Sequence, residues 1–133
     1  MVDLPAIRKQ IYDLNQKRQE AINRVLHTKA FIAAQVYERR RKCGKSNCKC
    51  AKGELHGPFL WIYQKKKGQK VISTTVAEGK AAEAKVMSGR YEELLRLRKK
   101  IREIDQKINV LLNEYESNME KEVAEYVKRK EQT

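Results

Sequence analysis

Residues 39–56 read RRRKCGKSNCKCAKGELH and contain all three cysteines of the 133-residue chain, with one of its two histidines. Cys43, Cys48, Cys50 and His56 follow the spacing Cys-x4-Cys-x-Cys-x5-His. Three thiols and an imidazole are a complete ligand set for a tetrahedral metal ion, and zinc accepts this mixture of sulfur and nitrogen. The sequence therefore predicts that these four residues bind zinc.

The spacing leaves other chemistry open. The single residue between Cys48 and Cys50 is a tighter gap than the two to four residues common in zinc sites. The cysteines could instead be reduced thiols without a ligand, a redox-active pair, or ligands of an iron–sulfur cluster, which usually takes four cysteines. We favour zinc, because thiols are seldom crowded into a lysine-rich segment without a metal to hold.

The same residues carry a resemblance to a known family. The segments CGKSNCKC (43–50) and GELHGPF (53–59), followed by an aromatic strand and GQK (68–70), resemble a family of small uncharacterised proteins. Its members share a Cys-Gly-Lys-x-Asn-Cys-x-Cys and His-Gly-Pro-aromatic signature and occur in bacteria, archaea, phages and mobile elements. The resemblance covers residues 39–75, and the later helical part more loosely. It implies a recurring metal-binding module near mobile DNA, and no reaction.

The positive charge of the chain is concentrated around this region. Of the formal net charge of +13, residues 38–70 carry +9, because they hold eleven Lys and Arg against two Glu. Such a field attracts polyanions, and nucleic acid is the first candidate. The alternative is that the first cations only stabilise the end of a preceding helix. We expect phosphates to contact the basic side chains of the region, which are Arg39, Arg40, Arg41, Lys42, Lys45, Lys49, Lys52, Lys65, Lys66, Lys67 and Lys70.

A β-hairpin is expected after the cysteines, because residues 59–64 and 71–76 are rich in aromatic and β-branched side chains. Alternation places Phe59, Trp61 and Tyr63 on one face of the first strand. These rings could stack on bases, as in single-strand binding proteins, or form a hydrophobic support beneath the zinc loop. We favour the support, since the module has few other apolar residues, and we expect Tyr63 near the rim to stack on an exposed base.

Long helices are expected on both sides of this module. Asp3 can cap the first helix, and apolar residues then recur at three- and four-residue steps as far as Val36. From about residue 78 the pattern is helical again, with a break expected at Ser88 and Gly89. Beyond that break, a regular apolar stripe consists of Leu94, Leu97, Ile101, Ile104, Ile108, Leu111 and Tyr115.

Together these patterns predict a mostly α fold with a small β-hairpin. We expect a long antiparallel helical hairpin, or coiled coil, that carries a zinc-bound β-hairpin tip. The expected parts of this single extended unit are an N-terminal long helix over residues 1–39, the zinc loop and hairpin over 40–77, and a C-terminal long helix over 78–133.

Catalysis and membrane insertion find little support in the sequence. A Cys3His site closes the zinc shell, no base accompanies a candidate nucleophile, and no phosphate-binding glycine loop is present. The longest uncharged run, residues 55–64, is too short to span a bilayer, and the N-terminal residues are not those of a signal peptide. Clustered cysteines that must stay reduced fit the cytoplasm. We expect a cytoplasmic protein without enzymatic activity or membrane contact.

The sequence leads to two hypotheses about function. In the first, a basic tip on a coiled-coil stalk binds DNA or RNA with weak sequence preference, because nothing resembles a recognition helix. In the alternative, the protein is an adapter whose helices bind a larger nucleic-acid-processing machine. In either case two helices bury little, so their exposed apolar stripes predict a homodimer or a helical protein partner.

Overall fold

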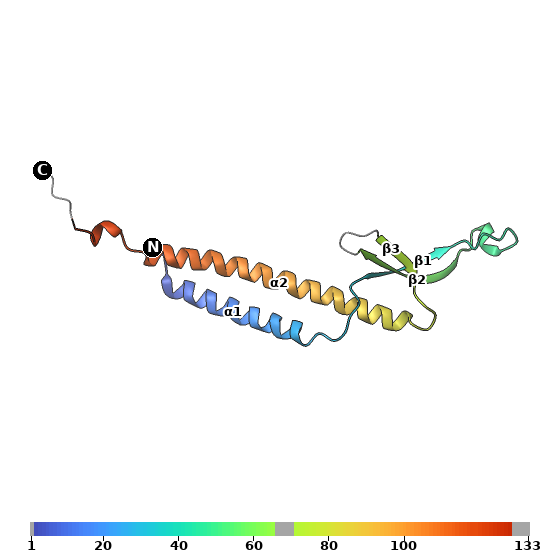
Figure 1. Ribbon diagram of the computed structural model, residues 1–133, viewed down its shortest axis with the longest axis horizontal. Coiled ribbons are helices and arrows are strands. Elements are labelled where there is room, and N and C mark those ends of the chain that lie inside the picture. The colour runs from blue at the N-terminus through green and yellow to red at the C-terminus, as the bar shows by residue number, and fades with distance from the viewer. Residues whose placement is uncertain (1, 66–70, 129–133) are drawn as a thin grey trace. The chain divides into compact units, whose positions relative to one another are not determined.

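The computed structural model describes residues 2–65 and 71–128. Within them the chain is mostly helical, with two helices, one of them long, and a small three-stranded antiparallel sheet (Figure 1). In chain order the elements are α1 (Leu4–Leu26), β1 (Gln35–Arg41), the 3-10 helix η1 (Lys49–Lys52), β2 (His56–Lys65), β3 (Val71–Thr75), α2 (Ala81–Met119) and the 3-10 helix η2 (Val123–Glu125).

The chain divides into two compact units, and α2 contributes to both. The helical unit consists of Met1–Leu26 and Leu97–Thr133, and the sheet unit consists of His27–Arg96. No helix in the described part of the chain combines the length and the low polarity that a membrane crossing requires.

In the helical unit, α1 and the C-terminal part of α2 run antiparallel. Arg8 donates a hydrogen bond to the Tyr115 hydroxyl at 3.3 Å, and Arg18 forms an ion pair with Asp105 at 2.5 Å. As the residue number rises along α1 it falls along α2, which fixes the direction of the pair. The buried residues of these two helix segments are apolar, and they are Ile7, Ala21, Leu97 and Ile104.

The N-terminal helix is shorter than the sequence suggested. Asp3 accepts a hydrogen bond from the backbone N–H of Ala6 at 3.3 Å, as a capping residue should, but α1 ends at Leu26. The prediction of one helix over residues 1–39 is therefore wrong, because residues 35–41 form β1. Val36 continues the helical spacing, yet it also suits a strand, and pairing with β2 satisfies the backbone of this segment through tertiary contacts.

The sheet has the order β1-β2-β3, so the expected hairpin of β2 and β3 is confirmed and β1 is an additional strand. Trp61 pairs with Tyr37 on one side and with Thr75 on the other. A bulge between Arg39 and Arg41 shifts the register near the start of β2. Gly57 lies at this point with φ of 120°, and a Cβ atom there would lie 2.9 Å from the Phe59 nitrogen. This position therefore requires glycine.

One face of the sheet packs against the N-terminal part of α2. Glu38 of β1 forms an ion pair with Lys85 of α2 at 2.8 Å, and Ile62 of β2 lines a hollow with Ala84. Helix α2 continues through Ser88 and Gly89, so the expected break is absent. The buried Ser88 hydroxyl donates to the carbonyl oxygen of Ala34 at 3.0 Å, which satisfies the hydroxyl at a contact that a larger side chain would obstruct.

Candidate metal centre

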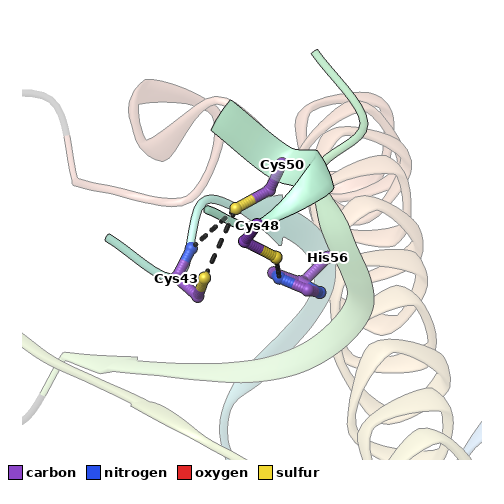
Figure 2. A group of neighbouring side chains, drawn as sticks. All are labelled: Cys43, Cys48, Cys50 and His56. Carbon is purple, nitrogen blue, oxygen red and sulfur yellow. Dashed lines mark hydrogen bonds between the residues drawn. The ribbon is translucent and has the colours of Figure 1, made fainter. Parts of the chain in front are cut away.

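The four predicted ligands converge on one point of the sheet unit (Figure 2). Pairing of β1 with β2 places Arg41 opposite His56, so Cys43, two residues beyond Arg41, starts close to the imidazole. Cys48 immediately precedes the short helix η1 and Cys50 lies within it, so this turn of the chain brings both cysteines back toward the strands. One ligand atom from each of the four side chains lies within 4.8 Å of all the others.

The spacing of these atoms fits a tetrahedral metal ion. The sulfurs of Cys43 and Cys50 are 3.4 Å apart, and the sulfur of Cys48 is 3.0 Å from Nε2 of His56. Zinc–sulfur bonds of about 2.3 Å at the tetrahedral angle place two thiolates ~3.8 Å apart. The two short pairs would have to open by about half an ångström, and pairs as far apart as 4.8 Å would have to close by up to ~1 Å, to reach this spacing around an ion. The residues present could hold a metal ion.

The thiols differ in their environments. Cys50 is 1% exposed, and the backbone N–H of Cys43 donates to its sulfur at 3.4 Å, which lowers the pKa of Cys50. For Cys43, the backbone N–H of Lys45 favours the thiolate, but the hydrogen bond with Cys50 and burial together raise its pKa. Since the thiolate is the form that binds metals, Cys50 is the better prepared of these two ligands.

The basic residues that precede the cysteines differ in their contacts. The guanidinium of Arg39 lies 5.9 Å from the centre of the Trp61 ring, and that of Arg41 lies 5.4 Å from Phe59 and 5.9 Å from Trp61. Arg40 instead donates to the carbonyl oxygen of Gly57 at 3.1 Å. Successive side chains of a strand point to opposite sides of the sheet. Arg39 and Arg41 therefore lie on the side of the Phe59 and Trp61 rings, whereas Arg40 contacts the backbone of β2.

A hollow of about 490 Å³ adjoins three of the four candidate ligands. It is lined by Arg41, Lys42, Cys43, Lys45, Cys48, His56 and Phe59. Three of the predicted phosphate contacts thus share one concave surface with the metal centre. Lys49 and Lys52 are exposed on η1. Phosphate contacts are also predicted for four lysines that lie outside the described part of the chain, namely the side chain of Lys65 and the whole of Lys66, Lys67 and Lys70.

The aromatic residues of β2 differ in their surroundings. Phe59 lines the hollow beside Cys48 and His56, so one end of the row does adjoin the metal loop. Trp61 is half-buried, and Tyr63 remains 37% exposed.

Sequence reasoning missed one residue of this surface. Tyr37 pairs with Trp61 across β1 and β2, and its hydroxyl shares a hydrogen bond of 2.8 Å with the Ser73 hydroxyl. Val36 and Tyr37 have high β-propensity, which could have indicated a strand here. The apolar residues at three- and four-residue steps up to Val36 favoured a helix instead.

The fold and the site define a mostly helical protein whose small antiparallel sheet carries a Cys3His cluster suited to a metal ion. Residues 6–86 match the family model described as Domain of unknown function (DUF6788), and these are more than half of the chain. The protein therefore belongs to this family. The matched region includes α1 except for its first two residues, the whole sheet and all four candidate ligands. Comparison with curated proteins and with solved structures gives no significant match.

Proposed function

We propose that the protein is a non-enzymatic, zinc-containing nucleic-acid-binding protein. The observation that carries this proposal is that three of the four convergent ligands, Cys43, Cys48 and His56, border a hollow that is also lined by Arg41, Lys42 and Lys45. A metal that fixes the loop would also fix these cations, so phosphates would meet a preformed surface.

Zinc is the proposed metal because the set of three thiols and one imidazole suits it and fills its tetrahedral shell. An iron–sulfur cluster usually takes four cysteines, and the chain contains three. A closed shell leaves no position for an activated water, so the metal would act as a structural crosslink. In small zinc domains such binding contributes about 10–16 kcal/mol to folding, which is enough to order the loop between β1 and β2.

Nucleic acid is the proposed partner because residues 38–56, which contain all four candidate ligands, hold seven Lys and Arg against two Glu, a formal charge of +5. Affinity that comes from phosphates falls steeply with salt, with a log–log slope of about −0.9 per phosphate neutralised on duplex DNA. The sequence contains no pattern that resembles a recognition helix, so we expect weak sequence preference. Whether DNA or RNA is bound is an outcome of the experiment below.

The test is a titration of the full chain with labelled DNA and RNA at several salt concentrations. A variant with Lys42, Lys45, Lys49 and Lys52 changed to Gln should lose affinity, and its salt slope should flatten by about two to four units. The control removes the same charge from exposed lysines of the helical unit, Lys9, Lys17, Lys99 and Lys100. Equal losses in both variants, or no salt-dependent binding by the unmodified protein, would contradict the proposal.

A second candidate function concerns the helices. A groove of about 510 Å³ runs along the helical unit, and Leu14, Val110 and Leu111 contribute its apolar lining. Val110 keeps 64% of its surface exposed, which is costly for an apolar side chain without a partner. This groove favours association of the helices as a coiled coil, either with a second copy or with a helical segment of a larger nucleic-acid-processing machine.

Sedimentation of the purified chain tests this association. Self-association that is lost in Val110→Glu, and retained when the exposed polar Asn113 is changed to Glu, would support a homodimer. If the chain is monomeric at all concentrations, the homodimer is excluded, and the remaining occupant of the groove is a helical segment of another protein.

A further inference from the structure

We infer that the nucleic acid is bound as a single strand, with its bases stacked on the aromatic face of the sheet. This face is defined here by Tyr37, Arg39, Phe59, Trp61 and Tyr63. The inference rests on the proposed function and specifies which form of nucleic acid the protein takes and where the bases lie.

The sheet register assembles this face from two strands. Tyr37 is opposite Trp61, and Arg39 is opposite Phe59, so the four side chains share one side of the sheet. The other side is the one that packs against α2, through Glu38 and Lys85. The aromatic face is therefore left accessible, and Phe59 and Tyr63 each keep 37% of their surface exposed.

The charge of the aromatic face complements a phosphate chain. The guanidiniums of Arg39 and Arg41 lie over the rings of Trp61 and Phe59, which interleaves cations with stacking surfaces. Single-strand binding proteins combine these two features, because every base has a face that can stack and every nucleotide carries a phosphate. Glu38 is the one carboxylate in the three described strands, and it is paired with Lys85 on the opposite face. No described strand residue therefore neutralises the two arginines.

Trp61 also carries a polar group that lacks a partner. Its Nε1 is buried without a hydrogen-bond acceptor among the described residues. An unsatisfied buried donor is costly, so a ligand that supplies an acceptor is favoured. Transfer of the Arg39 and Arg41 guanidiniums from the Trp61 ring to phosphates would uncover the ring and bring base acceptors within reach of this N–H.

The spacing of the rings favours an unpaired strand over a duplex. Alternate residues of a β-strand are ~6.6 Å apart, which is about twice the ~3.4 Å rise between stacked bases of B-DNA. Bases in a duplex are held at the shorter spacing with both faces covered, whereas a single strand can open to match the rings. At the Phe59 end the row meets the hollow lined by Arg41, Lys42 and Lys45, which can receive the next phosphate. We therefore expect a binding site of about four nucleotides, which is at the lower end of the site sizes of single-strand binding proteins.

The sole tryptophan of the chain, Trp61, reports directly on this face. The full, zinc-loaded chain is titrated with a twelve-nucleotide oligo-dT, an oligo-U of the same length, an abasic DNA strand with the same number of phosphates, and a twelve-base-pair duplex. Stacked bases should quench Trp61 fluorescence, and oligo-dT or oligo-U should bind at least tenfold more tightly than the abasic strand at ~150 mM salt. The abasic strand and the duplex should leave the fluorescence nearly unchanged.

A matched pair of variants locates the stacking. Tyr63→Leu removes a ring and keeps an apolar side chain, so it should weaken oligo-dT binding several-fold and leave abasic binding unchanged. Tyr12→Leu alters a tyrosine of the helical unit that is 72% exposed, and it should change neither the binding of oligo-dT nor that of the abasic strand. If oligo-dT and the abasic strand bind equally without quenching, the inference is overturned and the proposed function stands. If none of the four ligands binds, both are overturned.

Discussion

The two units of this protein are stabilised in different ways. The helical unit buries large apolar side chains, such as Leu97 and Ile104, between helices whose backbone bonds are internal. In the sheet unit the buried apolar residues among those described are small, namely Ala34, Cys50 and Ala84, while the aromatic side chains of β2 remain partly exposed. Hydrophobic burial can thus account for the order of the helical unit and much less for the metal loop. We therefore expect the order of the loop between β1 and β2 to depend on a bound metal ion.

The largest expected effect is on the metal centre. Cys50→Ser removes the most buried of the four candidate ligands and should abolish stoichiometric metal binding, with loss of amide protection from residue 43 to residue 56. Helical circular dichroism should remain nearly unchanged, because the helical unit does not use the metal. Ser46→Ala, at an exposed position of the same loop, is the control. A full equivalent of metal in Cys50→Ser, measured by elemental analysis, would refute the assignment.

The reverse experiment acts on the helical unit. Ile104 is buried between the helices, and Ile104→Ala should lower the free energy of unfolding by about 2–5 kcal/mol through lost burial and a cavity. Metal content should be unaffected. Leu112 is 48% exposed on the same helix, so Leu112→Ala should cost far less. Denaturant unfolding measures both, and equal losses would show that the two residues are not distinguished by burial.

A pair of glycine substitutions compares strand with helix. Gly57→Ala should destabilise the sheet by about 2 kcal/mol, because the new Cβ would lie 2.9 Å from the Phe59 nitrogen at φ of 120°. Gly89→Ala should stabilise the protein by about 1 kcal/mol, since a Cβ on α2 at this position meets nothing within 4 Å. Changes of the same sign in thermal unfolding would contradict this difference between the two backbones.

The smallest expected effect is a pH dependence at the contact of β1 with α2. The hydrogen bond from the Lys85 ammonium lowers the pKa of Glu38 below its ordinary 4.5. A lowered pKa means that this pair stabilises the folded state above about pH 4.5 and that the stabilisation disappears as the pH falls through the folded-state pKa. NMR titration of the Glu38 carboxyl should show the lowered value, and Lys85→Met should return it toward 4.5.

Part of the candidate site follows from local spacing alone. Cys43, Cys48, Cys50 and His56 stand out because three thiols and an imidazole within fourteen residues are typical of a metal site, and the structure does bring them together. The charge pattern predicts a basic surface, but it does not reveal the contacts of the individual side chains. The direction of a strand side chain depends on its register, so Arg39 and Arg41 lie over aromatic rings while Arg40 contacts the carbonyl oxygen of Gly57.

The errors in the fold have a common cause. Ile32 and Val36 continue the helical spacing and so predict a helix for residues 27–39, but β2 offers this segment a pairing partner that spacing does not reveal. Ser88 and Gly89 predict an interruption of α2, but the Ser88 hydroxyl is satisfied by Ala34, which is distant in sequence. Both outcomes depend on long-range contacts, which override modest local propensities.

The sequence by itself determined the ligand chemistry, the concentration of positive charge and the existence of two helices and a hairpin, because each depends on residues close together in the chain. Only the tertiary structure decided that β1 joins the sheet, that α2 covers one face of it, and that Arg39 and Arg41 lie over Trp61 and Phe59 on the other. The physical reason is that strand pairing sets which side chains share a face of the sheet. A shift of one residue in the register of a strand would move each of its side chains to the opposite face.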